Sequence, residues 1–395
     1  MYRKTLQTSV AVAALFAFAA PFAGPASAAN KNIVSSGSKV HIAITGQVGR
    51  VVSIVDDGNT TNIHHTNTNF SGTRVRFVGT AKAWDNLTIG TRIEFQFDSR
   101  NSNVSGNDTA GAGQDEDQGD VNGIDQRYQD ITFAGSWGKF YIGKVDSASN
   151  GTAEVDLSGT NIALDVNVGN AGFGGSSFII SNLAAGVSQD PNVNGGLAGP
   201  RASTVFTNFD GLSRTQRVRY DTPNFGGFKV SVGLNQGPIP DAAIRYVGSF
   251  AGTKVSLAIA WANRDSANLT QGHQIDGSAS ILHSSGLSLT IAGGTREIEP
   301  APVGRDDPSF IYAKLGYKAK LIGAGTTNFY VNYQNTEDLA AQGDDATYWG
   351  FGVVQILKDY ATELFAAFSV ADLDDSTLNT YDDLVTGLVG ARLKF

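Results

Sequence analysis

Two amphipathic segments joined by a tight turn make up residues 214–234, RTQRVRYDTPNFGGFKVSVGL. Before the PNFGG turn, Arg217 and Arg219 alternate with Val218 and Tyr220, and after it apolar and polar residues alternate again. A period of two places successive side chains on opposite faces of a strand. Residues 214–234 therefore predict an antiparallel β-hairpin in which each strand has one apolar and one polar face.

The same period recurs along most of the chain, whereas helical periodicity is hard to find. The clearest further examples cover residues 40–45, 74–82, 89–98, 254–264, 328–334 and 385–395. About sixteen strands of this kind fit into the chain, each near the 9–11 residues that a tilted strand needs to cross a bilayer. The pattern predicts an all-β protein.

The connections between these strands alternate in length. Short turns are predicted at WDNL (84–87), GSWG (135–138), PNFGG (223–227), SSG (284–286) and LIGAG (321–325). Long polar loops are predicted at residues 55–71, 99–125, 146–214, 265–272, 297–308, 335–346 and 372–382. Short periplasmic turns opposite long external loops are typical of a transmembrane antiparallel β-barrel. A soluble β-sandwich or a solenoid is the alternative, but neither has a reason to place its long loops at one end.

Residues 1–28 have the pattern of a cleaved signal peptide. Arg3 and Lys4 precede a short apolar run, residues 10–20, and the small residues of ASA (26–28) form a site of the kind that signal peptidase cuts. A retained membrane anchor is the alternative, but such a helix needs about 20 apolar residues. Residues 29–395 are then expected to form a single barrel domain. Without the two cations of the signal peptide, the net charge changes from −8 to −10.

Composition narrows the possible functions further. The chain of 395 residues has no cysteine, which excludes disulfides and cysteine metal sites. A closed barrel offers another source of stability, because every strand is paired and no edge remains. The acidic balance argues against nucleic acid as a partner. The sequence has no G-x-S-x-G elbow, P-loop or H-E-x-x-H motif, so neither an enzyme nor a resident cofactor is expected.

Three segments resemble Gram-negative porins. Residues 214–228 match a porin motif in which a strand ending in R-Y-D-x-P is followed by N-F-x-G-F, and GSWGKFYIGKVDS (135–147) is similar to the strand that leads into the third external loop. Members of that family commonly have Arg at the position of Lys144. The terminal VGARLKF ends on Phe395, which resembles the terminal aromatic residue that the barrel-assembly machinery reads in this family.

The resemblance implies a homotrimer of 16-stranded barrels in the outer membrane, in contact with lipid and lipopolysaccharide. Each barrel would hold a water-filled channel for passive diffusion of small hydrophilic solutes and ions. The third loop, here residues 146–214, would fold inward and narrow the pore between a basic wall and an acidic loop. This loop contains several apolar residues, among them Phe173 and Phe178, which indicates that it packs against something.

Six cations are candidates for the basic wall. They are Arg74, Arg76, Arg92, Lys144, Arg217 and Arg219. Arg74 and Arg76 share the polar face of one predicted strand, and Arg217 and Arg219 share that of another. Because the polar face of a barrel strand points into the lumen, these arginines are expected to line water. Lys144 instead has the parity of its apolar neighbours. Fixed charges of this kind select ions in wide pores, and the alternative is that they are ordinary solvated or paired charges.

The acidic face is expected from the start of the third loop. Its candidates are Asp146, Glu154, Asp156 and Asp165. A second acidic run lies in the second loop, with carboxylates at Asp115, Glu116, Asp117 and Asp120. Closely spaced carboxylates suit Ca²⁺ or Mg²⁺, which could bridge this loop to lipopolysaccharide or to a neighbouring subunit. The spacing differs from the EF-hand pattern, so a solvated loop is the alternative.

A weakly charge-selective diffusion channel is the function that these features favour. The negative net charge and the acidic loops would enrich cations at the mouth, whereas the wall arginines would oppose this. A substrate-selective porin is one alternative, and a secreted β-rich binding or adhesion protein is another from a different class.

Overall fold

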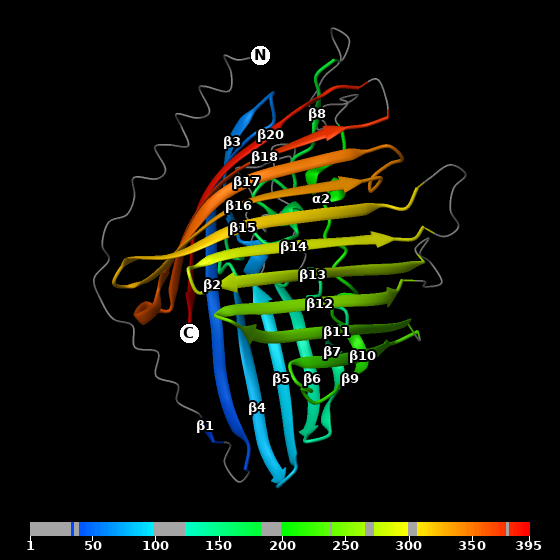
Figure 1. The fold of residues 1–395 in the computed structure, drawn as a ribbon, viewed down its shortest axis with the longest axis vertical. Helices are drawn as coiled ribbons and strands as arrows, with labels where there is room; N and C mark the ends of the chain where they lie inside the picture. The colour runs from blue at the N-terminus through cyan, green and yellow to red at the C-terminus, as the bar shows by residue number, and fades with distance from the viewer. Residues whose placement is uncertain are drawn as a thin grey trace.

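The described part of the chain is almost entirely β-strand (Figure 1). The computed structural model describes residues 33–34, 39–97, 123–182, 199–237, 239–264, 272–298, 306–376 and 379–395. The predicted signal peptide lies outside these residues. Within them, no helix is both long enough and apolar enough to span a membrane.

Sixteen antiparallel strands form a closed ring. Each pairs with its neighbours in the ring, and β20 pairs with both β18 and β2, which closes it. In ring order the strands are β2 (His41–Asp56), β4 (Arg74–Trp84), β5 (Leu87–Phe97), β6 (Ile124–Gly135), β7 (Gly138–Val145), β9 (Thr215–Asp221), β10 (Phe228–Asn235), β11 (Ile239–Phe250), β12 (Thr253–Asn263), β13 (His273–His283), β14 (Leu287–Arg296), β15 (Ser309–Ile322), β16 (Gly325–Glu337), β17 (Asp345–Leu357), β18 (Thr362–Asp374) and β20 (Leu384–Lys394). The predicted β-barrel of about sixteen strands is confirmed.

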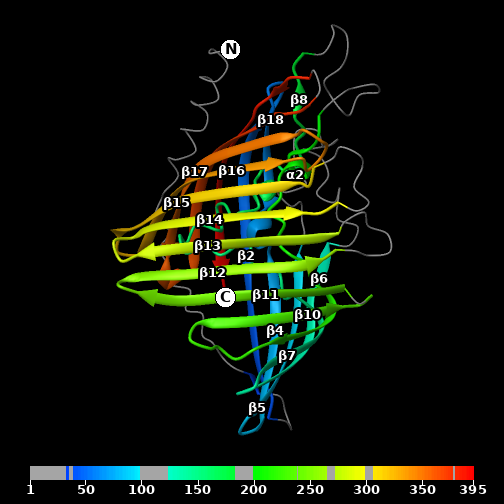
Figure 2. The same ribbon diagram turned by 45° about the vertical axis from the view of Figure 1, so that its right-hand side comes forward.

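Several shorter elements accompany the ring. Within the described residues, β1 (Ile33–Val34) and β3 (Thr61–Asn67) pair only with the two ends of β2. The others are η1 (Asn69–Ser71), η2 (Val168–Asn170), β8 (Ile179–Ile180), α2 (Ala202–Val205), η3 (Lys358–Tyr360) and β19 (Tyr381–Asp382). Figures 1 and 2 show β10 to β17 crossing the front of the barrel, while β2, β4 and β5 run behind them at a steep angle.

The barrel is apolar outside and polar inside. On β12, Leu257 and Ile259 are exposed on the outer surface, whereas Ala258 and Ala260, which alternate with them, are buried. The inner faces of the other strands carry Ser, Thr, Asn, Gln and charged residues, many of them buried. This is the reverse of a soluble protein and matches a wall with lipid on one side and the lumen on the other. The soluble sandwich is thereby excluded.

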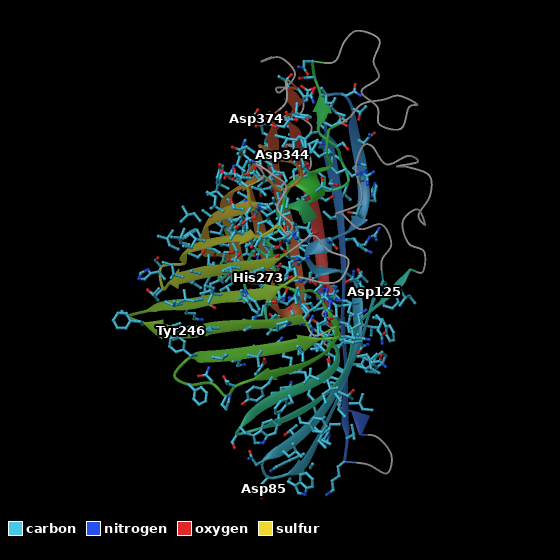
Figure 3. All side chains as sticks on the ribbon, turned by 90° about the vertical axis from the view of Figure 1, so that its right-hand side faces the viewer. Asp85, Asp125, Tyr246, His273, Asp344 and Asp374 are labelled. Atoms are coloured by element: carbon cyan, nitrogen blue, oxygen red, sulfur yellow. The ribbon has the colours of Figure 1, made fainter. Side chains whose placement is uncertain are left out.

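Short turns and long connections lie at opposite ends of the barrel. In Figure 3, Asp85, in the turn between β4 and β5, lies at the bottom, and Asp344 and Asp374, beside longer connections, lie toward the top. One connection departs from the predicted alternation. Only residues 236–238 join β10 to β11, although this link lies at the end of the long loops. This short link was not predicted from the sequence.

The main hydrophobic core lies inside the ring on one side. It combines aromatic residues of segment 146–214, such as Phe173 and Phe206, with inward-facing wall residues such as Phe310 and Tyr348. Phe173 and Tyr348 stack with their ring centres 5.8 Å apart. In Figures 1 and 2, α2 and its flanking segments lie behind β15 and β16, within the ring. The predicted inward folding of the third loop, and its packing against another part of the chain, are confirmed.

Candidate functional site

The first half of the third loop follows the inner wall strand by strand. Ser149 donates its backbone N–H to Asp241 of β11 over 2.7 Å, and Leu157 donates its N–H to Ser280 of β13 over 2.9 Å. A loop enclosed in a barrel needs partners for its backbone polar groups. The polar inner face of the strands supplies them, so the path of the loop is fixed by the wall.

A buried ion pair anchors the loop at β15. Lys314 Nζ lies 2.8 Å from Asp156 and donates to the carbonyl of Leu164 over 2.7 Å, and neither charged side chain is more than 1% exposed. Burial alone would raise the pKa of Asp156, but the Lys314 ammonium and the hydrogen bonds from Ser158 lower it overall. Asp156 therefore faces the wall, and the prediction that it belongs to the acidic face of the lumen is wrong.

The second half of the loop returns along the same wall. Gln334 of β16 donates its side-chain amide to the Thr207 carbonyl over 2.8 Å, and Gln274 of β13 donates to the carbonyl of Phe209. The Phe209 ring meets Phe310 edge to face with ring centres 5.8 Å apart. These contacts combine hydrogen bonding with aromatic burial, so the second half of the loop is also attached to the inner wall.

An arginine cluster lies on β4 to β6, across the ring from the loop's anchor at Lys314. Arg74 and Arg76 of β4 both contact Glu94 of β5, with Arg74 Nη1 3.4 Å from Glu94 Oε1. The Glu94 side chain is fully buried, whereas that of Arg76 is 37% exposed. The two arginines therefore point inward, as the sequence predicts from their shared parity.

A third arginine joins this cluster from a β-bulge on β6. Glu94 pairs with Tyr128 and Phe95 pairs with Gln126, so Arg127 has no partner in the ladder. A bulge of this kind redirects side chains. Arg127 Nε lies 2.8 Å from Glu94 Oε1. Sequence reasoning missed Arg127 because a regular alternation places it on the opposite face from Tyr128.

Arg92, the predicted cation of β5, belongs to an adjacent network. Arg92 lies 2.8 Å from Asp130 of β6, and its guanidinium lies 3.4 Å above the centre of the Tyr128 ring. The Tyr128 hydroxyl donates to Asp146 over 2.7 Å, and Arg214 also contacts Asp146. Asp146 is thus joined to the basic wall rather than placed across the lumen from it.

The arginines of β9 hold the two ends of the loop. The Arg217 side chain is fully buried, lies 3.4 Å from Asp241 and donates to the carbonyl of Ser213 over 2.8 Å. Arg219 donates to the carbonyl of Ser147 over 2.9 Å. The prediction that Arg217 lines water is wrong, because the end of the loop covers it. Arg219 retains the predicted inward direction but is engaged in fixing the loop.

Lys144 lies apart from the cluster. It approaches Asp125 of β6 at 3.7 Å, and both side chains are partly exposed. A long, solvated pair of this kind contributes little. The structure therefore does not bring Lys144 together with the arginines of β4 and β5.

Two of the predicted loop acids meet a third that the sequence did not single out. Glu154 accepts a hydrogen bond from Asn208, Asp165 accepts one from the Asn167 N–H, and Asp210 lies close enough to influence both carboxyls. Burial, reinforced by the neighbouring carboxylates, raises the pKa of Glu154 well above its usual range. Burial also raises the pKa of Asp165 to about 7, with a further contribution from Asp210. These three residues form an acidic group on the loop.

Another wall arginine missed at the sequence level is Arg245 of β11. It donates to the carbonyls of Ala148 and Asn150, over 2.8 and 2.7 Å. Its only sequence signal was its place in the alternating run 239–250, which was not among the clearest strands. Arg245 therefore fixes the beginning of the loop from the same part of the wall as Arg219, since β9 and β11 both pair with β10.

The terminal residue lies at the closing seam of the barrel. Phe395 exchanges two backbone hydrogen bonds with Gly46 of β2, over 2.7 and 3.0 Å. Its ring covers Gly46 so closely that a Cβ at that position would lie 2.5 Å from the ring. The predicted divalent-ion residues Asp115, Glu116, Asp117 and Asp120 lie outside the described residues.

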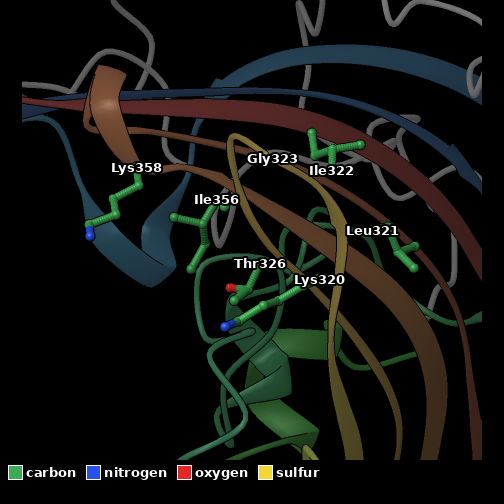
Figure 4. A pocket seen from close by; sticks show the side chains of 8 residues that line it. Lys320, Leu321, Ile322, Gly323, Thr326, Ile356 and Lys358 are labelled. Carbon is green, nitrogen blue, oxygen red and sulfur yellow. The ribbon is translucent and has the colours of Figure 1, made fainter.

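A separate pocket of about 510 Å³ lies at the short-turn end, beside the turn between β15 and β16 (Figure 4). Lys320, Leu321, Ile322, Thr326, Ile356 and Lys358 are among the residues that line it. None of the predicted constriction residues lines this pocket, so it is not part of the site described above.

Solved outer-membrane proteins share this fold. The chain is similar to an anion-selective porin from Comamonas acidovorans, with 16% identity, a TM-score of 0.59, and 90% of this chain and 100% of that chain covered. It also resembles OmpF of Salmonella typhi in complex with daunomycin, with 12% identity, a TM-score of 0.55, and 90% and 98% covered. OmpT of Vibrio cholerae in its trimer form shares 12% identity at a TM-score of 0.52, with 91% and 100% covered.

The sequence itself carries a family signature over most of its length. No curated protein matches the chain, but the model of the Gram-negative porin family matches residues 10–376. Together with a closed 16-stranded barrel, an apolar outer face and a polar inner face, this match identifies both the family and the membrane. The chain belongs to the Gram-negative porin family and is an outer-membrane channel for passive diffusion.

Proposed function

We propose that the channel carries out no catalysis and that its selectivity arises between the arginine cluster and the third loop. The observation that carries this proposal is the placement of Arg74, Arg76 and Arg127 together on the inner wall, with the Arg76 side chain 37% exposed, across the ring from the loop's anchor at Lys314. Partly exposed cations at such a place act on every ion that passes.

The loop acids supply the opposite charge when they ionise. Burial and mutual proximity raise the pKa of Glu154, Asp165 and Asp210, so the negative charge of this acidic group, and with it the field across the water-filled passage, would grow as the pH rises through about 7 at Asp165. Polar solutes can orient in such a field, whereas apolar solutes gain nothing from it. The net charge of the mature chain gives a slight preference for cations, as the sequence predicts.

Planar-bilayer recording tests this proposal. Purified protein should form open channels, and a KCl gradient should give a small reversal potential that declines at high salt, because salt screens the wall charges. Absence of conductance would contradict the diffusion channel. A reversal potential at the ideal value for one ion would contradict weak selectivity and favour a substrate-selective pore.

Assembly and membrane partners complete the proposal. The chain would be exported by residues 1–28, inserted by the barrel-assembly machinery that reads Phe395, and assembled as a homotrimer. The broad apolar outer face supports contact with lipid and with other copies. Divalent ions at residues 115–120 would link the second loop to lipopolysaccharide. An unboiled sample in detergent should migrate as an oligomer that boiling converts to monomer, and an unboiled monomer would contradict the trimer.

A further inference from the structure

Two neighbouring turns build the pocket at the short-turn end of the barrel (Figure 4). The backbone N–H of Lys358, in η3 between β17 and β18, donates to the carbonyl of Ala324 in the turn between β15 and β16 over 2.9 Å. A Cβ at Gly325 would collide with the carbonyl oxygen of Ile356, so the two turns are in close backbone contact. The pocket beside them holds about 510 Å³, a usual size for a site that binds a small molecule.

A bulge in β15 gives this pocket both a cation and an apolar rim. The register of β15 and β16 shifts after Ala319, so Lys320 and Leu321 together face Thr326 alone. A bulge of this kind redirects side chains. In Figure 4, Lys320 lies on the same side as Thr326, whereas Leu321 points away from them. Adjacent residues of one strand therefore offer the pocket an ammonium group and an isobutyl group.

The lining of the pocket is basic. Lys320 and Lys358 belong to it, and none of the described residues that line it is acidic. Within the part of the chain that the structure describes, neither lysine forms an ion pair, whereas Lys82 and Lys394 at the same end of the barrel pair with carboxylates at 3.2 and 2.9 Å. An ammonium donates hydrogen bonds and accepts none, so the two lysines suit an anionic group rich in oxygen, such as a phosphate.

The apolar part of the lining continues the outer surface of the barrel. Leu321 and Ile322 are exposed, as are the outward-facing Leu315 and Tyr317 earlier in β15. Deeper in the pocket, Ile356 packs against the main core. The short turns of an outer-membrane barrel lie on the periplasmic side, at the level of the inner leaflet's headgroups. A small free anion would need only the lysines, whereas an amphiphile with an anionic head uses the lysines and the apolar rim together.

We propose that this pocket binds the headgroup of an anionic phospholipid from the inner leaflet. The lipid phosphate contacts Lys320 and Lys358, and the acyl chains lie against Leu321 and the outer face of β15. This inference goes beyond diffusion through the pore and does not require the channel to conduct.

Native mass spectrometry of the folded protein in neutral detergent tests the proposal. Added phosphatidylglycerol should bind more tightly than phosphatidylcholine with the same acyl chains. Lys320→Gln and Lys358→Gln should each weaken the binding of phosphatidylglycerol by about fivefold, because each lysine near an anionic lipid contributes about this factor. The matched control Lys82→Gln/Lys394→Gln removes two lysines that already have carboxylate partners, and it should bind like the native protein.

Acetylation of the native protein provides a second measurement that needs no variant. Phosphatidylglycerol should protect Lys320 and Lys358 from acetic anhydride, quantified by peptide mass spectrometry, while Lys82 reacts as before. The proposal is overturned if neither pocket lysine is protected, or if phosphatidylcholine protects them equally well. Equal protection by inorganic phosphate would show a site for a free anion instead of a lipid. The proposal also fails if the control variant loses as much binding as Lys320→Gln/Lys358→Gln.

Discussion

Asp165 couples the charge of the third loop to pH. Because its pKa is raised to about 7, the folded protein keeps a proton on this carboxyl at a pH where the unfolded chain, with a pKa near 3.8, has released it. A rise in pH between these values therefore makes the folded loop less stable, and the folded loop becomes more negative as the pH passes through about 7. Lowering the pH from 8 to 6 should reduce the preference for cations, measured as a shift in reversal potential.

Asp165→Asn provides the control for this pH effect. The variant has no carboxyl to titrate, so its reversal potential should vary less between pH 6 and 8 than that of the native channel. The wall arginines stay charged throughout this range and cannot produce the change in reversal potential with pH. An unchanged pH dependence in the variant would show that another group is responsible.

The alternation of side chains along a strand predicts their direction and environment only where the strand is regular and no loop covers it. Arg74 and Arg76 were placed correctly because β4 alternates without interruption at their positions. Arg127 was missed because a bulge changes the phase of β6. Arg217 has the right parity but the wrong environment, since the loop that covers it comes from distant residues. No local pattern records what packs over an inner wall, which is why Asp156 was also misplaced.

The opposite faces of one strand should respond differently to charge. Leu257 of β12 is exposed on the outer surface, and Leu257→Arg should reduce the free energy of folding into lipid vesicles by about 2–4 kcal/mol if it lies near the midplane. Ser256→Arg is the matched control, because Ser256 is adjacent to Leu257 in the strand and faces inward. Equal costs for the two variants, measured by urea titration, would contradict a lipid-facing and a lumen-facing side.

The ion pair between Lys314 and Asp156 should hold the third loop in place. Lys314→Met leaves a buried carboxylate without its cation, which typically costs about 3–5 kcal/mol. Urea unfolding in detergent should show this loss, and single-channel conductance should become larger or noisier as the loop loosens. The double variant Lys314→Met/Asp156→Leu removes both charges and should recover most of the stability. If single and double variants are equally destabilised, the pair is not the anchor.

Element boundaries were predictable where turns have typical residues. The PNFGG turn was recognised, and its two glycines adopt positive φ angles of 61° and 97°. The turn between β11 and β12 was missed because it consists of Ala251 and Gly252, both with positive φ. This geometry suits a two-residue hairpin turn but favours Asn or Gly over Ala at the first position. The short link between β10 and β11 was also missed, because the sequence has no long polar run at that position.

At the scale of the whole molecule, two separate features stabilise the channel. The ring is stabilised by strand pairing without an edge, and the interior by the third loop, whose apolar residues bury the inward aromatic residues of one wall. The barrel therefore does not need a lumen filled with side chains all round. Among the residues that the structure describes, the loop packs on one side of the interior, and Arg76 on the wall of β4 to β6 stays 37% exposed, so the same packing that stabilises the interior also limits where a passage can run.

Closure of the ring should depend on its last residue. Phe395 exchanges two backbone hydrogen bonds with Gly46 and covers that glycine with its ring, where β20 meets β2. Deleting Phe395 would remove both bonds and expose the end of the seam, so the truncated barrel should unfold at a lower temperature. Gly46→Ala should act in the same direction, because its methyl group and the ring cannot occupy the same space.

Refolding in detergent separates this role from recognition during assembly. Protein refolded from urea never meets the assembly machinery, so any loss of stability reflects the seam alone. The temperature at which the folded band on an unboiled gel converts to the unfolded band should fall for the Phe395 deletion and for Gly46→Ala. It should stay near the native value for Phe395→Tyr, which keeps an aromatic ring. If the deletion converts at the native temperature, the contact with Gly46 does not stabilise the barrel, and the terminal aromatic would act only as an assembly signal.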